Sequence, residues 1–158
     1  MSNATVAPRF LYQRPSEPFV GEVNVRVGLE NWADRENVRR GLMRAEDVRS
    51  TEIDIVVDTG ATQLVLPEEV VERLGLTFLG TAPVSYADDR REERPVAGMV
   101  TVRVAGREAP VQCVVGHRGT EPLLGQVGLE ITDLLVDCAR QRLVPNPESP
   151  DKPHYKIK

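Results

Sequence analysis

A run of apolar residues ends abruptly in an acid in the segment Ile53-Asp54-Ile55-Val56-Val57-Asp58-Thr59-Gly60-Ala61. β-Branched residues favour strands, and the strand expected over residues 51–58 carries Asp58 at its end. An ionised carboxylate that leaves water needs hydrogen-bonding or charged partners. A strand directed into such an acid therefore indicates that Asp58 has a functional use, around which the rest of the chain is organised.

The composition excludes several classes of function. A chain of 158 residues with 41% apolar residues is long enough for one globular domain with a sizeable core. The formal charge of −4 and the aromatic content of 4% disfavour nucleic acid, which requires a basic surface. No apolar run approaches the roughly 20 residues of a membrane-spanning helix, and residues 1–14 lack the apolar centre of a secretory signal. We therefore expect a cytoplasmic protein that binds neither nucleic acid nor membrane.

The cysteine and histidine pattern argues against metal or thiol chemistry. Cys113 and Cys138 lie in apolar runs, which predicts buried and reduced thiols, as in a reducing compartment. His117 and His154 have no partner at the spacing of a metal site and are expected to face solvent. We expect no metal and no cofactor.

Periodicity predicts short strands joined by two or three short helices. Alternating residues over 23–29 indicate a half-buried strand. In the charged stretch 31–50, Asp34 is the expected N-cap of a short helix with Val38 and Leu42 on one face. A second helix is expected over 67–74, with proline at its start and Gly75 after its end. A third is expected over 126–133.

The remaining segments indicate paired strands. Residues 81–98 form an expected hairpin with a charged tip at 87–92, and residues 99–105 and 108–115 form another around Gly106. Residues 134–137 and 142–144 are the expected last strand pair. Because no βαβ alternation is sustained, the pattern favours a mainly β barrel or sandwich.

Proline and charge set the expected domain limits. Residues 1–18 are interpreted as an extended or disordered N-terminal arm, 19–145 as the folded domain and 146–158 as a C-terminal tail. Residues 134–139 weakly repeat the pattern of 55–60 without its hydroxyl and glycine. We interpret the second acid, Asp137, as a structural residue in a turn.

Four features together resemble the retroviral-type (retropepsin-like), single-domain aspartic proteases. Asp58-Thr59-Gly60-Ala61 follows an apolar strand, a second apolar run comes after it, a polar-tipped hairpin follows at the place of the flap, and Leu123-Leu124-Gly125 comes near the end. More narrowly, the chain is similar to bacterial clan AA aspartic proteases over about residues 19–145. The resemblance implies a mainly β, retropepsin-like fold with one Asp-Thr-Gly lobe per chain and Leu123-Leu124-Gly125 as a supporting second motif.

The resemblance also implies a mechanism. Two carboxylates share a proton and activate a water for peptide hydrolysis, and one chain supplies only Asp58. A homodimer is therefore implied, with a peptide or protein substrate. Thr59 would bond across the dimer axis, and the Gly60 amide would bond the Asp58 carboxylate. Ala61, where pepsin relatives often have serine, predicts a weakly acidic pH optimum.

The flap assignment and the reaction leave alternatives open. Tyr86, Ala87 and Asp88 are the expected substrate contacts of the flap, but the same segment also fits an ordinary surface hairpin. The charged tip, the long stretch 31–50 and the C-terminal tail depart from viral enzymes. A catalytically silent dimeric peptide-binding module is the main alternative function. A phosphatase that depends on Asp58 and Mg²⁺ is a weaker one.

Overall fold

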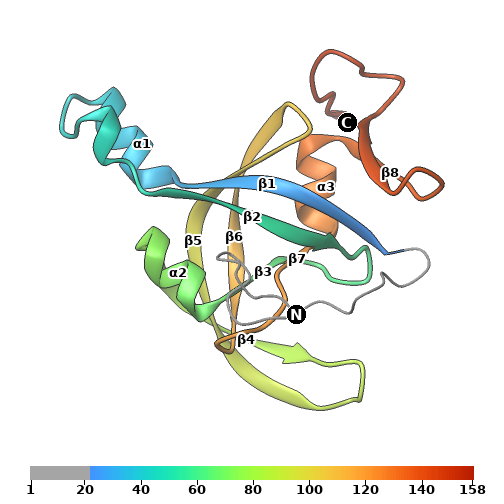
Figure 1. Ribbon diagram of the computed structural model, residues 1–158, viewed down its shortest axis with the longest axis horizontal. Coiled ribbons are helices and arrows are strands. Elements are labelled where there is room, and N and C mark those ends of the chain that lie inside the picture. The colour runs from blue at the N-terminus through green and yellow to red at the C-terminus, as the bar shows by residue number, and fades with distance from the viewer. Residues whose placement is uncertain (1–21) are drawn as a thin grey trace, which may run out of the picture.

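The structure, a computed structural model, describes residues 22–158 and is dominated by one seven-stranded mixed sheet. The sheet has the order β1-β2-β7-β3-β6-β5-β4, and β1 also pairs with β5, so that the sheet curls back on itself (Figure 1). The mainly β architecture predicted from the sequence is confirmed. The seven strands are β1 (Val23–Asn31), β2 (Ser50–Val57), β3 (Leu64–Pro67), β4 (Thr77–Ser85), β5 (Arg91–Val104), β6 (Arg107–Gly116) and β7 (Leu123–Leu124).

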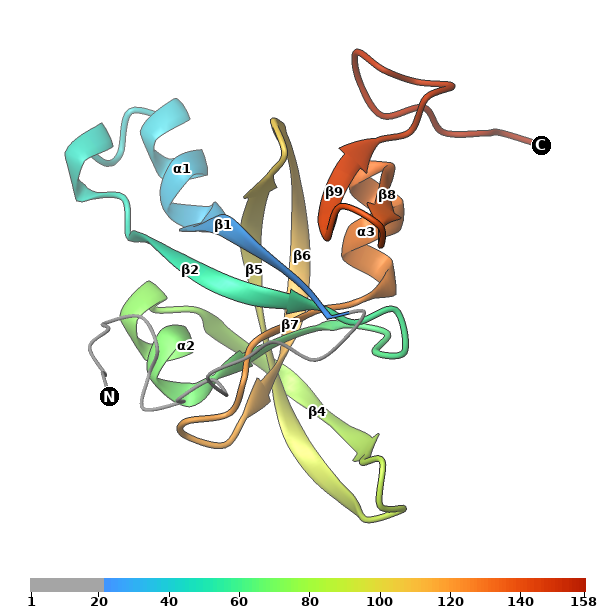
Figure 2. The same cartoon turned by 45° about the vertical axis from the view of Figure 1, so that its right-hand side comes forward.

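Short helices and a small second sheet surround this curled sheet. The helices are α1 (Trp32–Arg39), α2 (Glu68–Leu74) and α3 (Gln126–Thr132), with a 3₁₀ turn, η1 (Ala45–Asp47). Strands β8 (Leu134–Asp137) and β9 (Arg142–Pro145) pair only with each other. Figure 2 shows β8 and β9 beside α3, while α1 and η1 project from the far ends of β1 and β2.

The core consists of the inward-facing residues of the curled sheet and the apolar side of α2. Alternate positions of β1, β2 and β6 point inward, which follows from the two-residue period of a strand. The largest fully buried side chains include Leu29, Ile53, Ile55, Leu64, Leu66, Leu74 and Leu124. β2 therefore runs through the core until Val57 and delivers Asp58 to its rim.

The predicted helix at 67–74 is confirmed. Pro67 precedes α2 as its N-cap, Glu68 and Glu69 occupy the first turn, and Gly75 ends the helix in a left-handed conformation with φ of 62°. The left-handed conformation favours glycine, whereas the nearby Arg49 guanidinium is the end of a flexible side chain that could move aside.

The prediction that Asp34 caps the first helix is wrong. Asn31 is the N-cap of α1, and its side chain accepts a 2.9 Å hydrogen bond from the Asp34 amide. Asp34 is instead buried and binds the Arg49 guanidinium through Nε and Nη2, both at 2.9 Å. Leu42 lies beyond the end of α1 and is 75% exposed, so it does not share a buried face with Val38.

Only one of the two cysteines is buried. Cys113 lies in the core on β6, where burial raises the pKa of its thiol to about 12, which leaves it inert as a nucleophile. Cys138 lies in the exposed turn between β8 and β9, which corrects the prediction of a buried thiol. In the same turn, the Arg140 amide donates a 3.1 Å hydrogen bond to Asp137, in agreement with the structural role expected for that acid.

Both predicted hairpins form, but they share one strand. β5 is continuous from Arg91 to Val104 and pairs with β4 over its first half and with β6 over most of its length. The register shifts between Phe78 and Gly80 in the β4–β5 pair and between Ala97 and Val100 in the β5–β6 pair. These shifts let one strand belong both to the projecting hairpin and to the core.

The C-terminal residues are anchored rather than free. Asp133 accepts hydrogen bonds from the side chains of Asn146 and Ser149 and from the His154 amide. The buried Arg107 donates to the Ser149 carbonyl. The predicted N-terminal arm, residues 1–18, and the predicted domain start at residue 19 lie outside the described residues. Within residues 22–158, no helix combines the length and apolar character needed to cross a membrane.

Candidate active site

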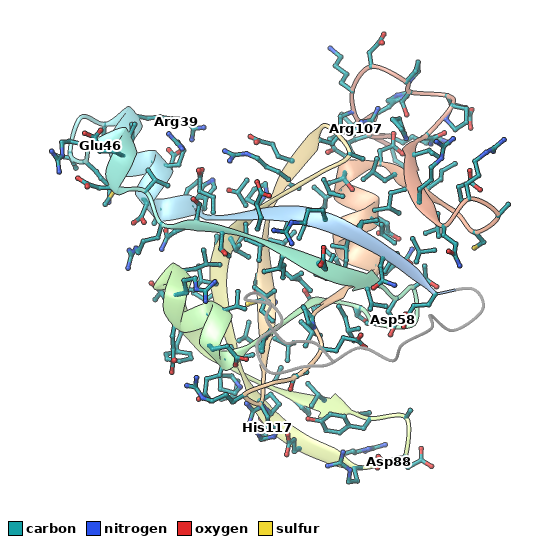
Figure 3. The ribbon with its side chains drawn as sticks, viewed as in Figure 1. Arg39, Glu46, Asp58, Asp88, Arg107 and His117 are labelled. Atoms are coloured by element: carbon teal, nitrogen blue, oxygen red, sulfur yellow. The ribbon has the colours of Figure 1, made fainter. Side chains whose placement is uncertain are left out.

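The Asp58 loop begins where β2 leaves the core. The Asp58 amide donates a 3.0 Å hydrogen bond to the Leu124 carbonyl, which ties the start of the loop to β7. The Gly60 amide donates a 2.9 Å hydrogen bond to Asp58 Oδ1, as predicted from the sequence. The Ala61 amide closes the turn with a 3.1 Å bond to the Asp58 carbonyl. Figure 3 shows Asp58 at the rim of the curled sheet.

The Leu123-Leu124-Gly125 run supports this loop directly. β7 lies between β2 and β3, with Leu123 in register with both Val56 and Val65. Beyond β7, the amides of Gln126 and Val127 donate to the carbonyls of Ala61 and Thr62 at 2.8 and 3.0 Å. The first turn of α3 therefore holds the far side of the Asp58 loop.

Gly125 is required by the closeness of the two segments. A Cβ at this position would lie 2.5 Å from the Gln63 carbonyl oxygen and 2.7 Å from that of Ala61. Both obstacles are backbone atoms, so neither can turn aside as a side chain could. Leu123-Leu124-Gly125 is thus linked to the Asp58 loop in two ways: by hydrogen bonds, and by a close approach that leaves no room for a side chain at Gly125.

The outer side of the Asp58 loop is open. Asp58 and Ala61 are half-buried, while Thr59 and Gly60 are exposed. Within residues 22–158, the Thr59 hydroxyl forms no hydrogen bond, and the Gly60 amide is the one donor to the Asp58 carboxylate. The loop thus presents a carboxylate and a hydroxyl on the surface, on a backbone that is held rigidly from behind.

The projecting hairpin of β4 and β5 carries the predicted flap residues at its tip. The turn is closed by hydrogen bonds of 2.9 Å from the Tyr86 amide to the Arg90 carbonyl and 3.0 Å from the Asp89 amide to the Tyr86 carbonyl. Ala87 and Asp88 are exposed, and the neighbouring Arg90 lowers the pKa of Asp88 chiefly by a hydrogen bond. In Figure 3, Asp88 lies at the tip of the hairpin.

Tyr86 is held in one orientation by its neighbours. Its hydroxyl donates a 2.7 Å hydrogen bond to Glu92 Oε1, which raises the pKa of the phenol. The Arg90 guanidinium stacks 4.4 Å from the centroid of the ring. The sequence indicated Tyr86, but it gave no sign of its partner Glu92 or of His117, which also contacts Glu92 at 2.6 Å. The pairing of β5 with β4 brings Tyr86 to Glu92, and the pairing of β5 with β6 brings His117 there.

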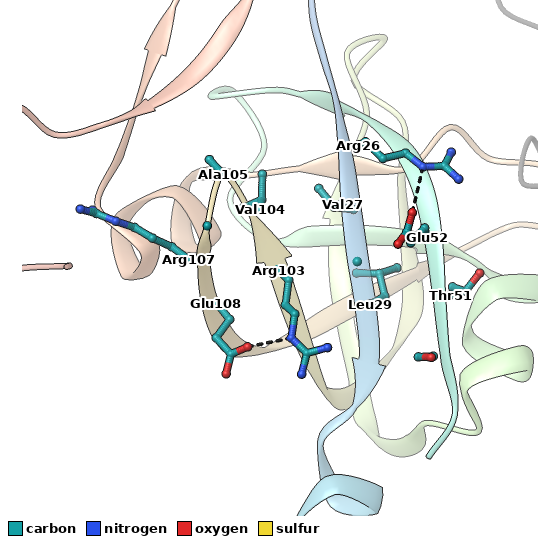
Figure 4. A pocket seen from close by; sticks show the side chains of 13 residues that line it. Arg26, Val27, Leu29, Thr51, Glu52, Arg103, Val104, Ala105, Arg107 and Glu108 are labelled. Carbon is teal, nitrogen blue, oxygen red and sulfur yellow. Dashed lines mark hydrogen bonds and ion pairs between the residues drawn. The ribbon is translucent and has the colours of Figure 1, made fainter. Parts of the chain in front are cut away.

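A groove of about 620 Å³ lies elsewhere, over β1, β2, β5 and β6 (Figure 4). Four of its charged side chains form ion pairs, Arg26 with Glu52 at 3.5 Å and Arg103 with Glu108 at 2.7 Å. The fifth, Arg107, donates to the backbone carbonyls of Thr132 and Asp133. None of residues 58–62 or 86–88 lines it. The groove therefore belongs to a solvated, charge-paired face of the sheet and offers no chemistry to Asp58.

No metal centre occurs in the part of the chain that the structure describes. Among residues 22–158, no three His, Cys, Asp or Glu side chains are grouped so that they could hold an ion. The Asp58 loop and the second motif behind it form the candidate site, and the projecting hairpin is the predicted flap.

A closed β-sheet, an Asp-Thr-Gly loop supported by an apolar-apolar-Gly strand and a projecting hairpin together define a retropepsin-like aspartyl protease domain. In agreement, the family model described as "gag-polyprotein putative aspartyl protease" matches residues 47–130, more than half of the chain, and the chain belongs to this family. The match contains Asp58, the hairpin and Gly125. Comparison with curated proteins found no match.

Proposed function

We propose that the protein is an aspartic endopeptidase that hydrolyses peptide bonds as a homodimer, with Asp58 of each copy forming the catalytic pair. The observation that carries the proposal is the Asp58 loop, in which a carboxylate oriented by the Gly60 amide lies at an open rim. A reaction that needs two carboxylates requires a second copy, because each chain has one such loop. A two-fold axis would bring the two loops face to face.

In the proposed reaction, the ionised Asp58 takes a proton from a water molecule, whose oxygen attacks the carbonyl carbon of the peptide. The protonated Asp58 of the second copy donates its proton to the carbonyl oxygen, which gives a tetrahedral diol. The first Asp58 then gives its proton to the amide nitrogen, the C–N bond breaks with its electron pair going to the amine, and the diol collapses to a carboxylic acid as one of its hydroxyls returns a proton to the second Asp58. The pair is thereby restored for another cycle.

The other predicted residues have supporting roles in this proposal. Thr59, whose hydroxyl has no partner among the described residues, would bond the backbone of the second copy across the axis. Leu123, Leu124 and Gly125 hold the loop from behind. Tyr86, Ala87 and Asp88 would close over a peptide or protein substrate. We further propose a cytoplasmic protein whose catalytic domain spans 19–145.

The test uses the conservative variant Asp58→Asn, which keeps the shape of the carboxylate but cannot act as a base. The wild-type protein should cleave members of a broad peptide library, a pepstatin-type transition-state mimic should block the cleavage, and Asp58→Asn should cleave none while sedimenting as the same dimer. Cleavage by the variant would contradict the mechanism. A wild-type protein that binds peptides without cutting them would indicate a silent binding module.

A further inference from the structure

Glu92 joins the projecting hairpin to a loop outside it. Its Oε1 accepts the Tyr86 hydroxyl at 2.7 Å and lies 2.6 Å from Nε2 of His117, in the loop after β6. Tyr86 is part of the tip of the hairpin, and Glu92 lies in its stem on β5. One carboxylate oxygen thus connects three segments that are separate in the sequence. Figure 3 shows His117 beside the stem.

The loop that carries His117 is itself held by α2. Arg118 Nη2 binds Glu68 at 3.0 Å and Glu72 at 2.9 Å, and the Gly119 amide donates to the Glu69 carboxylate at 3.1 Å. The Thr120 amide closes the loop on the His117 carbonyl at 3.0 Å. His117 is therefore a fixed point on the body of the domain, and its contact with Glu92 restrains the hairpin.

We propose that Glu92 and His117 form a latch that positions the hairpin and its Tyr86 against the body of the domain, and that the latch is tighter when His117 is protonated. Histidine side chains ordinarily change charge between pH 5 and 8. Protonation of the imidazole would add a positive charge to a hydrogen bond that already has the Glu92 carboxylate as its acceptor, and the attraction between opposite charges strengthens the contact. Glu92 and His117 are thus positioning residues. Any effect of theirs on a substrate rests on the proposed protease function, whereas the restraint of the hairpin by the latch does not.

The carboxylate of the latch stays ionised, and its charged neighbours are themselves engaged. The hydrogen bond from Tyr86, followed by that from His117, lowers the pKa of Glu92, so this carboxylate keeps its charge. Arg94 lies 3.8 Å from Glu92 and donates to the Val115 carbonyl at 2.9 Å. On the other side, the acids of α2 are engaged with Arg118 and the Gly119 amide. Of the described residues, Glu92 is the one acid in contact with His117.

The latch can be measured by amide hydrogen exchange of residues 81–98 in the full-length protein without substrate. After correction for intrinsic exchange, we expect roughly two- to fivefold greater protection at pH 5.5 than at pH 7.5, the range expected for a partly exposed ion pair. His117→Gln keeps a hydrogen-bonding side chain but cannot titrate, and it should remove this pH dependence. Glu92→Gln should lower protection at pH 5.5 to the level seen at pH 7.5.

His154→Gln is the matched control, because His154 is exposed and its contact with Asp133 is made by the backbone amide. This variant should keep the wild-type pH dependence. Equal protection of the wild-type hairpin at both pH values, or an unchanged pH dependence in His117→Gln, would overturn the latch. Because no cleavage is measured, an inactive protein would contradict the proposed function and leave this result intact.

Discussion

The Gly60 amide donates a 2.9 Å hydrogen bond to Oδ1 of Asp58, so the backbone of the loop itself orients the carboxylate. The partner is two residues away, and the turn between them is closed by the bond from Ala61 to the Asp58 carbonyl. The orientation of Asp58 therefore depends on the shape of a short loop, which in turn rests on β7 and the start of α3.

A methyl group at Gly60 should disturb the site without unfolding the protein. The Cβ of Gly60→Ala would lie 3.1 Å from Asp58 Oδ1, closer than a comfortable contact. We expect kcat to fall roughly ten- to a hundredfold, because small displacements of reacting groups have effects of this size. The melting temperature should change little. Gly28→Ala is the control, since its Cβ would make an ordinary 3.6 Å contact. Wild-type activity in Gly60→Ala would show that the loop tolerates a side chain there.

A methyl group at Gly125 should instead destabilise the fold. Its Cβ would meet the carbonyl oxygens of Gln63 and Ala61, at 2.5 and 2.7 Å, so the two segments would have to separate. We expect a loss of about 1–3 kcal/mol in the free energy of unfolding, typical of forced overpacking. Denaturant titration beside Gly28→Ala measures it, and a loss below about 0.5 kcal/mol, the usual limit of a neutral substitution, would contradict the steric reason.

The sequence predicted the parts of the fold that depend on local patterns. Alternation in β1, the cap signals of α2 and the apolar run before Asp58 are all local, and each gave the observed element. The motif at 58–61 predicted the Gly60 bond because both partners lie within one turn. The reason for Gly125 could not be read this way, since the atoms that exclude a side chain belong to residues 61–63, which meet it only in the folded sheet.

The two wrong predictions and the contact that the sequence did not indicate have separate physical causes. Aspartate is a residue type that often caps helices, but Asp34 is buried in an ion pair with Arg49, and Asn31 is the N-cap instead. Cys138 follows an apolar strand, yet β8 and β9 form a separate pair whose turn faces solvent. The Glu92–His117 contact spans 25 positions and leaves no periodic trace.

Removing the Asp34 carboxylate should reveal how much this buried pair stabilises the domain. Asp34 accepts hydrogen bonds from the Arg49 amide at 3.0 Å and from its guanidinium, and the side-chain bonds are the largest cause of its lowered pKa. Because Arg49 is half exposed, we expect Asp34→Asn to cost roughly 1–3 kcal/mol at pH 7. Asp47→Asn, at an exposed ion pair, is the matched control.

The difference between wild type and Asp34→Asn should also depend on pH. A carboxyl whose pKa is lowered on folding contributes its stability above the ordinary carboxyl pKa of about 3.9 and loses it as the pH falls through the folded value. The free energies of unfolding of wild type and Asp34→Asn, measured by denaturant titration at each pH, should therefore converge below about pH 4. A constant difference down to low pH would indicate that the charge of Asp34 does not matter.

Asp133 should control the C-terminal segment. Its bonds to Ser149, Asn146 and the His154 amide, named in order of effect, lower its pKa to about 2, so the charged form persists until the pH falls through that value. In Asp133→Ala, the amides of residues 146–155 should exchange several-fold faster at pH 4 and pH 7. Asp151→Ala removes an exposed acid of the same segment and should exchange like wild type. Unchanged exchange in Asp133→Ala would mean that the contacts left in place, from Arg107 to the Ser149 carbonyl and from Tyr155 to the Ile131 carbonyl, suffice to hold the segment.

The shared catalytic pair is tested most directly by mixing subunits. Wild-type and Asp58→Asn chains, unfolded together in equal amounts and refolded, should form homodimers and mixed dimers at random. If each site needs Asp58 from both copies, the total activity should be about one quarter of that of the same amount of wild-type protein, because only wild-type homodimers are complete. Separation of the dimers by a tag on one chain confirms that mixed dimers form. With mixed dimers present, a total activity of about three quarters would show that one Asp58 per dimer suffices, and about one half would show that each chain acts alone; either result would contradict the two-chain active site.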